Sequence, residues 1–221
     1  MADTAVSADG TLGTSSLMQP SDEAAKPELR RLFRAKRLRA LETEPDLQDR
    51  ILDQTRLELR RRLQLGELRD AIGLYWPLPG EVDLRPLRAD LFADFGLTTA
   101  LPVADGQGEM TYRLWSESPL SADGCGIPAP LDQPDLKADQ LSLLLVPALA
   151  VDLMGIRLGY GGGYYDRLRS RDIWGDVPAL VVLPGACVSL QPLPADPWDR
   201  PFSGWVCENG YRSGESTSGN D

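Results

Sequence analysis

The sequence predicts an α/β fold, a single domain in which a mainly parallel sheet is flanked by helices. Apolar runs at 71–76, 97–103, 141–146 and 178–183 are short and bounded by turn residues, as buried strands are. Helix-forming stretches separate several of these runs, and strands that alternate with helices favour parallel pairing. Ligands bind such sheets beyond the carboxyl ends of the strands. We therefore expect a site in the segments that follow these strands.

Two helices are expected before the first strand. Leu29, Phe33 and further apolar residues recur at roughly helical spacing over 26–41, and basic residues fill the other face. A second helix is predicted over 46–68, where the run Arg60-Arg61-Arg62 is expected to face solvent. These helices would precede the sheet as an N-terminal addition to it.

The later elements follow from caps and turn residues. Asp83 is expected to cap a helix over 84–95, and Gly96 is expected to end it. The other expected elements are strands at 110–115 and 202–207 and a helix at 164–171.

The two ends of the chain show no apolar periodicity. Residues 1–25 and 212–221 are rich in small and polar residues, which predicts a disordered leader and tail around a domain at 26–211. No signal peptide is visible, and the longest apolar run, 141–151, is too short for a membrane span. We expect a cytoplasmic protein that is monomeric and binds no membrane.

Composition excludes several classes of chemistry. The chain of 221 residues has no histidine, which removes Ser-His-Asp and Cys-His hydrolases, HExxH metalloproteases and histidine-based acid–base chemistry. Three cysteines without a CxxC pair indicate neither a zinc knuckle nor a disulfide scaffold. A formal charge of −10 argues against a nucleic-acid partner. However, 13 of the 23 basic residues lie between Lys26 and Arg69, and such a local basic patch fits a small polyanion.

The segment Arg157-Leu-Gly-Tyr-Gly-Gly-Gly-Tyr-Tyr-Asp-Arg167 carries the strongest functional signal. Glycines let the backbone approach a ligand closely, and N–H groups at the start of a helix favour anions. Arg157 adds a cation suited to bidentate contacts, and Asp166 adds a hard oxygen ligand of the kind that Mg²⁺ takes beside phosphates. A lone glycine-rich turn is more often structural. The arginine, the paired tyrosines and the aspartate at fixed spacing favour a phosphate site.

Several segments, in order, resemble the 5-formyltetrahydrofolate cyclo-ligase (methenyltetrahydrofolate synthetase) family. They are Lys26-Pro-Glu-Leu-Arg30, Ile72-Gly-Leu-Tyr-Trp-Pro-Leu-Pro-Gly-Glu-Val-Asp83, Leu145-Val146-Pro147, Arg157 to Asp166, and Asp196-Pro-Trp-Asp199-Arg-Pro201. The glycine-rich segment is highly specific, and the others reinforce it by order and spacing. Trp198 stands where the family often has histidine, Ala148 where it has glycine, and Leu84 where it has threonine.

The resemblance implies an enzyme that uses ATP and Mg²⁺ to convert 5-formyltetrahydrofolate to 5,10-methenyltetrahydrofolate, with release of ADP and phosphate. Phosphoryl transfer needs mainly positioning and charge stabilisation, which a chain without histidine can supply. Lys26 and Arg157 would carry the catalytic charge. The residues implied in ATP binding are Lys26, Pro27, Glu28, Leu29, Arg30, Arg157, Leu158, Gly159, Tyr160, Gly161, Gly162, Gly163, Tyr164 and Tyr165.

The resemblance also implies a folate site and a metal site. Asp166 and Asp199 would hold Mg²⁺, although a turn-capping role for Asp199 is an equal alternative. Trp76 offers a flat wall, with core packing as its alternative, and Glu81 can accept hydrogen bonds from pterin N–H groups. The residues implied in folate binding are Trp76, Glu81, Tyr160, Gly161, Gly162, Gly163 and Tyr164.

Two other functions remain open at this point. A sugar-phosphate isomerase-like enzyme would use the same glycine loop, but that hypothesis rests on loop and fold alone. A non-catalytic folate or nucleotide binder would show binding without turnover.

Overall fold

The structure is a computed structural model that describes residues 22–214, so the expected leader up to residue 21 and the tail from 215 lie outside the described residues. The elements, in order, are α1 (Asp22–Thr43), α2 (Leu47–Gln64), β1 (Ala71–Gly73), α3 (Leu87–Phe95), β2 (Thr98–Ala104), β3 (Met110–Leu114), β4 (Ser121–Ala122), β5 (Pro128–Ala129), the 3-10 turn η1 (Ala138–Gln140), β6 (Leu141–Pro147), β7 (Ala150–Asp152), β8 (Arg157–Leu158), α4 (Tyr164–Ser170), α5 (Asp172–Gly175), β9 (Ala179–Val182), η2 (Gly185–Cys187), β10 (Val188–Ser189), β11 (Gly204–Cys207) and β12 (Gly210–Ser213).

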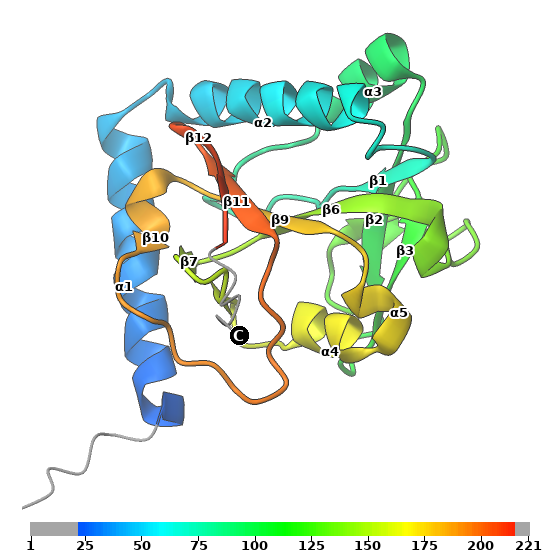
Figure 1. Cartoon of the computed structure of the whole chain (residues 1–221). Coiled ribbons are helices and arrows are strands. Elements are labelled where there is room, and N and C mark those ends of the chain that lie inside the picture. Colours follow the sequence, from blue (N-terminus) through cyan, green and yellow to red (C-terminus); the bar gives the residue numbers. More distant parts are fainter. Residues whose placement is uncertain (1–21, 215–221) are drawn as a thin grey trace, which may run out of the picture.

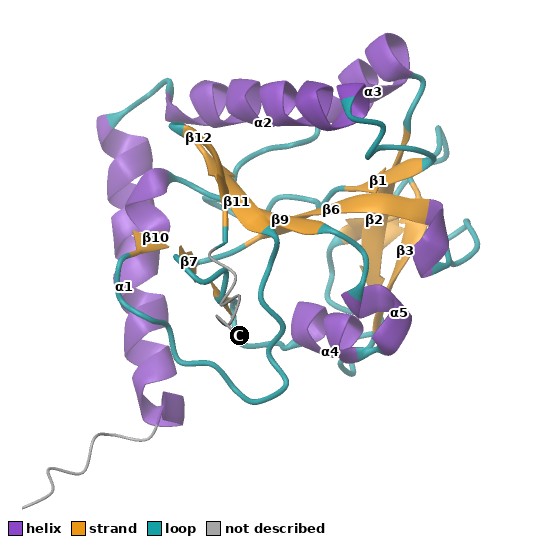
Figure 2. Cartoon of the chain, in the orientation of Figure 1, coloured by secondary structure: helices purple, strands orange, loops and turns teal. Residues whose placement is uncertain are grey.

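The expected parallel sheet is confirmed. Within the described chain the large sheet has seven strands in the order β12-β11-β9-β6-β1-β2-β3. Its five inner strands pair in parallel, and the edge strands β12 and β3 pair antiparallel with their neighbours. Small sheets of β10-β7-β8 and β4-β5 stand beside it. Figure 2 shows the strands running through the middle of the molecule with helices on both sides.

Successive side chains of β6 point to opposite faces of the sheet, where they belong to two separate layers of the core. Leu144 and Val146 face one layer, and Leu143 and Leu145 face the other. Every one of these side chains is fully buried, which explains why the strand reads as a continuous apolar run. Helix α2 lies across one face of the sheet, α4 and α5 lie at the opposite face, and α1 stands along the end near β10 (Figure 1). The described helices include none that is both long enough and apolar enough to cross a membrane.

Several local expectations need correction. Helix α1 begins at Asp22, inside the expected leader, and β12 includes Arg212 and Ser213 from the expected tail. Helix α3 begins at Leu87 without a side-chain cap. Asp83 instead accepts hydrogen bonds from the backbone N–H and the guanidinium of Arg85, because a short polar side chain readily closes a turn onto the residue two positions on.

The triple-arginine run does not face solvent throughout. Arg62 is buried, since its Nε donates to Oε1 of the buried Glu58 at 2.7 Å, whereas Arg60 and Arg61 are exposed. The expected end of α3 at Gly96 is confirmed, and that glycine has φ +65°, the left-handed conformation that glycine adopts most readily.

Gly73 at the end of β1 is required by packing. A Cβ at this position would lie 2.5 Å from Cδ2 of Leu144 and 2.8 Å from Cε1 of Tyr112, both fully buried. We therefore expect Gly73→Ala to lower the free energy of unfolding by about 1–3 kcal/mol through overpacking. Urea titration followed by circular dichroism measures this change. A loss below about 0.5 kcal/mol would mean that the core around β1 yields easily.

Candidate active site

The glycine loop connects β8 to α4 and is held by arginines from two helices. Arg30 of α1 donates from Nε to the carbonyl of Gly159 at 3.1 Å. Arg167 of α4 donates from Nε to the carbonyl of Gly108 at 2.7 Å and also donates to the carbonyl of Gly162. Gly163 has φ +67°, and a Cβ there would lie 2.6 Å from Nη1 of Arg167. These hydrogen bonds fix the loop, and the left-handed backbone at Gly163 favours glycine there.

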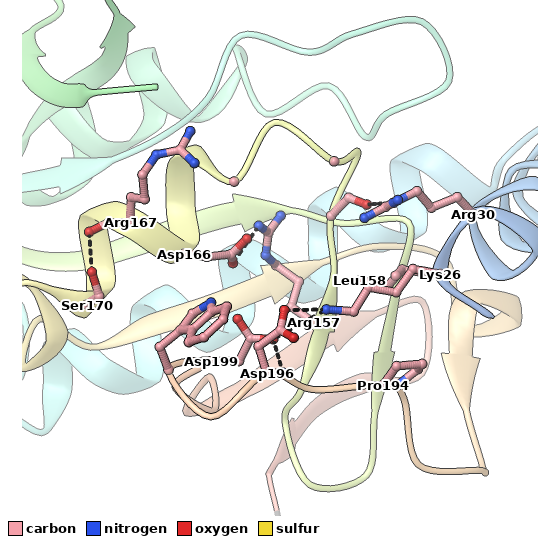
Figure 3. A pocket seen from close by; sticks show the side chains of 14 residues that line it. Lys26, Arg30, Arg157, Leu158, Asp166, Arg167, Ser170, Pro194, Asp196 and Asp199 are labelled. Atoms are coloured by element: carbon pink, nitrogen blue, oxygen red, sulfur yellow. Dashed lines mark hydrogen bonds and ion pairs between the residues drawn. The ribbon is translucent and has the colours of Figure 1, made fainter. Parts of the chain in front are cut away.

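A charged cavity of about 480 Å³ lies on one side of this loop. Figure 3 shows side chains from α1, the glycine loop and the late Pro-rich segment (residues 190–201) converging there. Its lining residues are Lys26, Arg30, Arg157, Leu158, Gly159, Gly161, Gly163, Asp166, Arg167, Ser170, Pro194, Asp196, Trp198 and Asp199. The cavity thus combines four cations with three carboxylates.

Lys26 bridges the first helix to the late Pro-rich segment. Its Nζ lies 2.6 Å from Oδ2 of Asp196 and 4.0 Å from Oδ2 of Asp199. The segment closes as a turn at this point: Asp199 N–H donates to the Asp196 carbonyl, and Asp196 N–H donates to Oδ2 of Asp199, both at 2.9 Å. Asp199 therefore closes a turn and also lines the cavity, so a turn-capping role does not exclude a role as a metal ligand.

Arg157 is the buried cation at the centre of the site. Its side chain is 5% exposed, and Nη1 donates to the Pro147 carbonyl at 3.1 Å. Nη2 donates to Oδ1 of Asp166, also at 3.1 Å, and the guanidinium lies 5.0 Å from the centre of the Tyr165 ring. Its Nε has no hydrogen-bond partner in the described chain. This buried donor is therefore unsatisfied within the described residues, which is costly.

A second, mostly apolar cavity of about 240 Å³ lies on the other side of the loop. Its lining residues are Tyr75, Trp76, Leu78, Glu81, Pro102, Ala104, Met110, Asp123, Cys125, Ile127, Pro147, Arg157, Tyr160, Gly162, Gly163, Tyr164 and Tyr165. Trp76 is braced edge-on by Trp115 at 6.0 Å between ring centres. Flat aromatic walls with few polar groups suit a planar heterocyclic ligand.

The two cavities share Arg157 and Gly163, which line both. A guanidinium at a wall between a charged chamber and an apolar one is placed to contact the reacting ends of two ligands. This arrangement is suited to moving a charged group from a polyanion to an apolar molecule.

Glu81 is the buried carboxylate of the apolar cavity. Oε2 accepts a hydrogen bond from the Leu78 N–H at 2.7 Å, whereas Oε1 has no partner in the described residues. Burial raises the pKa of Glu81. The nearby Tyr160 hydroxyl opposes this rise, although its geometry falls short of a full hydrogen bond. An unpaired oxygen buried in a cavity is costly unless a ligand donor meets it.

We expect Glu81→Gln to stabilise the protein without ligand. The pKa of Glu81 is higher in the folded protein than in the unfolded chain. With respect to this group, the protein is therefore most stable at a pH below the unfolded-state pKa, where Glu81 is neutral. It loses that stability as the pH rises through the folded-state pKa. At pH 7 the substitution should therefore raise Tm, at about 2–4 °C per kcal/mol for a chain of this size. Thermal melts between pH 4 and pH 8 measure the effect, and the gain should vanish at the acidic end.

The structure brings most of the predicted site residues together. Lys26, Arg30, Asp166 and Asp199 meet in the charged cavity, as do Arg157, Leu158 and three loop glycines. Trp76, Glu81, Tyr160, Gly162, Tyr164 and Tyr165 line the apolar one. Pro27, Glu28 and Leu29 line neither cavity, because they lie on other faces of α1. The roles assigned to all these residues stay predictions.

Sequence reasoning missed three residues that organise the site. Asp196 pairs with Lys26, Arg167 fastens the glycine loop, and Arg37 of α1 donates to the Tyr160 hydroxyl. The spacing of Asp196 from Asp199 and the position of Arg167 next to Asp166 were visible signals. No such signal marked Arg37, whose partner lies 123 residues further along the chain.

A match to a family model shows to which protein family this chain belongs. Residues 22–208 match the model of the 5-formyltetrahydrofolate cyclo-ligase family. The chain belongs to the 5-formyltetrahydrofolate cyclo-ligase family. The match spans both cavities and every segment that carried the resemblance in the sequence.

Cyclo-ligase relatives agree with this membership. The chain is 31% identical over 148 residues to 5-formyltetrahydrofolate cyclo-ligase of Haemophilus influenzae, covering 63% of this chain and 78% of that protein. It is 32% identical over 137 residues to the Escherichia coli K12 cyclo-ligase, covering 59% and 74%. It is therefore an enzyme of a ligase family.

The fold is also that of a solved relative. The NMR structure of Aquifex aeolicus 5,10-methenyltetrahydrofolate synthetase superimposes with a TM-score of 0.70 at 28% identity, covering 89% of this chain and 96% of the other. A 5,10-methenyltetrahydrofolate synthetase from Mycoplasma pneumoniae, 18% identical with a TM-score of 0.63 over 83% and 98%, shares the fold. The cyclo-ligase fold expected from the sequence is thus confirmed.

Proposed function

We propose that this protein uses ATP and Mg²⁺ to convert 5-formyltetrahydrofolate to 5,10-methenyltetrahydrofolate, releasing ADP and phosphate. One observation carries the proposal: the charged and apolar cavities meet at Arg157 and Gly163. A polyanion and an apolar heterocycle bound in the two chambers would bring their reacting ends together there. Family membership supports the same reaction.

The charged cavity would hold the triphosphate. Lys26 and Arg157 are now paired with Asp196 and Asp166, so phosphate oxygens would replace carboxylates as their partners. Arg30 and the loop backbone extend the same surface. Exchange of one anionic partner for another keeps each buried cation paired, which avoids the cost of an unpaired charge.

The donor set of this cavity fits Mg²⁺ that arrives with ATP. Among residues 22–214 no group of three or more carboxylates, cysteines or histidines forms a metal cage. Mg²⁺ needs none, because it is usually held by one or two carboxylates together with phosphates and water. Asp166 and Asp199 are the hard oxygen ligands that would hold it, and it would neutralise charge on the phosphates.

The apolar cavity would hold the folate. Trp76 and Tyr164 provide aromatic walls, and Glu81 would accept hydrogen bonds from the pterin N–H groups through Oε1, which has no partner within the described residues. This contact uses the buried carboxylate that is otherwise unfavourable. A sugar phosphate has no planar aromatic ring to stack on these walls, so the folate substrate accounts for more of the cavity.

The chemistry then takes place at the shared wall. The formyl oxygen attacks the γ-phosphorus and the bond to the β-phosphate oxygen breaks, so ADP leaves. Folate N10 attacks the activated formyl carbon and loses its proton, and departure of phosphate completes the methenyl bridge. Arg157, held by the Pro147 carbonyl, would stabilise the charge on the transferring phosphoryl group, while Lys26 would neutralise the remaining phosphates.

The test is a direct assay of the purified full chain. Incubation with 5-formyltetrahydrofolate and Mg-ATP should give methenyltetrahydrofolate absorbance and an equal amount of ADP. Absence of the product with intact binding of folate and nucleotide would make the protein a non-catalytic binder. Product formed without ATP would contradict the phosphoryl step. Monomeric state and cytoplasmic location stay predictions.

A further inference from the structure

Trp198 lines the charged cavity but has no role in the reaction described above. It is 61% exposed, whereas the neighbouring Asp199 side chain is 18% exposed. Within the described residues Trp198 stacks on no other aromatic ring and on no cation. An exposed indole at the edge of a cavity leaves apolar surface in water that a flat ligand would cover.

Hydrogen bonds and an ion pair hold the turn that carries this indole. Trp198 lies inside the turn that the reciprocal hydrogen bonds of Asp196 and Asp199 close, directly after Pro197. Lys26 fastens the same turn to α1 through its ion pair with Asp196. A ligand that stacks on the indole would therefore not have to order the backbone of this turn.

The two cavities also give the nucleotide a direction. The γ-phosphate must lie at the shared wall of Arg157 and Gly163 if it is to reach the folate. The base then lies away from that wall. Trp198 is the one aromatic residue among the described residues that line the charged cavity. The late Pro-rich segment that carries it also carries Asp199, so base and metal contacts would come from one segment.

We propose that Trp198 is the stacking platform for the adenine ring of ATP. The inference rests on the proposed function, because it takes ATP as the occupant of the charged cavity. It adds a contact that sets nucleotide affinity without touching the reacting atoms. Loss of the indole should weaken binding of the nucleotide and raise KM for ATP, while kcat stays unchanged.

Calorimetric titration of the full-length protein with Mg-ADP and with Mg-tripolyphosphate separates base from phosphate contacts. Trp198→Ala should weaken Mg-ADP binding about 10-fold, the scale of losing one base–aromatic stack, and Trp198→Phe should recover most of it. Tripolyphosphate, which has no base, should bind all three proteins equally. Leu190→Ala is the matched control, because Leu190 is 77% exposed on the same segment and lies outside the cavity.

Three results would overturn the inference. Unchanged Mg-ADP affinity in Trp198→Ala would show that the base lies elsewhere. Equal weakening of Mg-ADP and tripolyphosphate would show that the indole only supports the turn. Failure of the unmodified protein to bind either ligand would overturn the proposed use of ATP itself, and the inference with it.

Discussion

Arg157→Lys is expected to lower kcat/KM for ATP-dependent methenyl formation by about 10²–10³-fold, the usual cost of removing a donor aimed at transition-state charge. The guanidinium donates to the Pro147 carbonyl and pairs with Asp166, which oxygens of the phosphoryl group would replace. An ammonium group cannot keep this forked geometry. Steady-state kinetics from the methenyl absorbance measures the loss, and circular dichroism confirms that the variant is folded.

A surface arginine supplies the control for this substitution. Arg171 is 42% exposed and pairs with Glu109 away from both cavities, so Arg171→Lys should leave kcat/KM unchanged. If Arg157→Lys retains more than half of the unmodified activity, the shared wall is not where the phosphoryl group moves.

Asp166→Asn is expected to abolish most of the turnover while leaving folate binding within about 2-fold, since only the charged cavity includes this residue. The substitution removes a carboxylate that would hold Mg²⁺ under the proposed function, and also half of the Arg157–Asp166 ion pair. Activity that remains should require more Mg²⁺. Rates measured across a Mg²⁺ titration, together with folate binding from tryptophan fluorescence, separate the two effects.

Asp172→Asn provides the matched carboxylate change, because the Asp172 side chain is fully exposed and lines neither cavity. It should alter neither the rate nor the Mg²⁺ dependence. An unchanged Mg²⁺ dependence in Asp166→Asn would remove Asp166 from the metal site and leave it as the partner of Arg157 alone.

The sheet was predictable because its inner strands are buried on both faces. The run at 141–146 reads as continuous apolar sequence for that reason, and β6 and β9 were found within one residue of their expected positions. The strands of the β10-β7-β8 sheet were missed, since two or three residues show no periodicity. The buried position of Arg62 depends on Glu58, which a count of charges does not reveal.

Most of the residues that line the two cavities were predictable from the sequence, but the separation of the site into two cavities was not. The glycine segment and Asp166 form a local pattern, so the sequence alone identifies them. The separation into a charged and an apolar chamber depends on packing between distant segments, such as Arg30 against Gly159, which are 129 positions apart. The family resemblance supplied roles for single residues. The shared wall at Arg157 appears only in three dimensions.

The Lys26–Asp196 ion pair joins residues 170 positions apart. The charged cavity therefore contains residues from both ends of the domain, and its residues are all present later in synthesis than those of the apolar cavity. All residues that line the apolar chamber have been translated once Tyr165 is added, whereas the charged chamber must wait for Asp199. At ordinary translation speed the delay is on the order of 2–7 s. A nascent chain that stops within this interval contains every residue that lines the apolar cavity and lacks the late wall of the charged one.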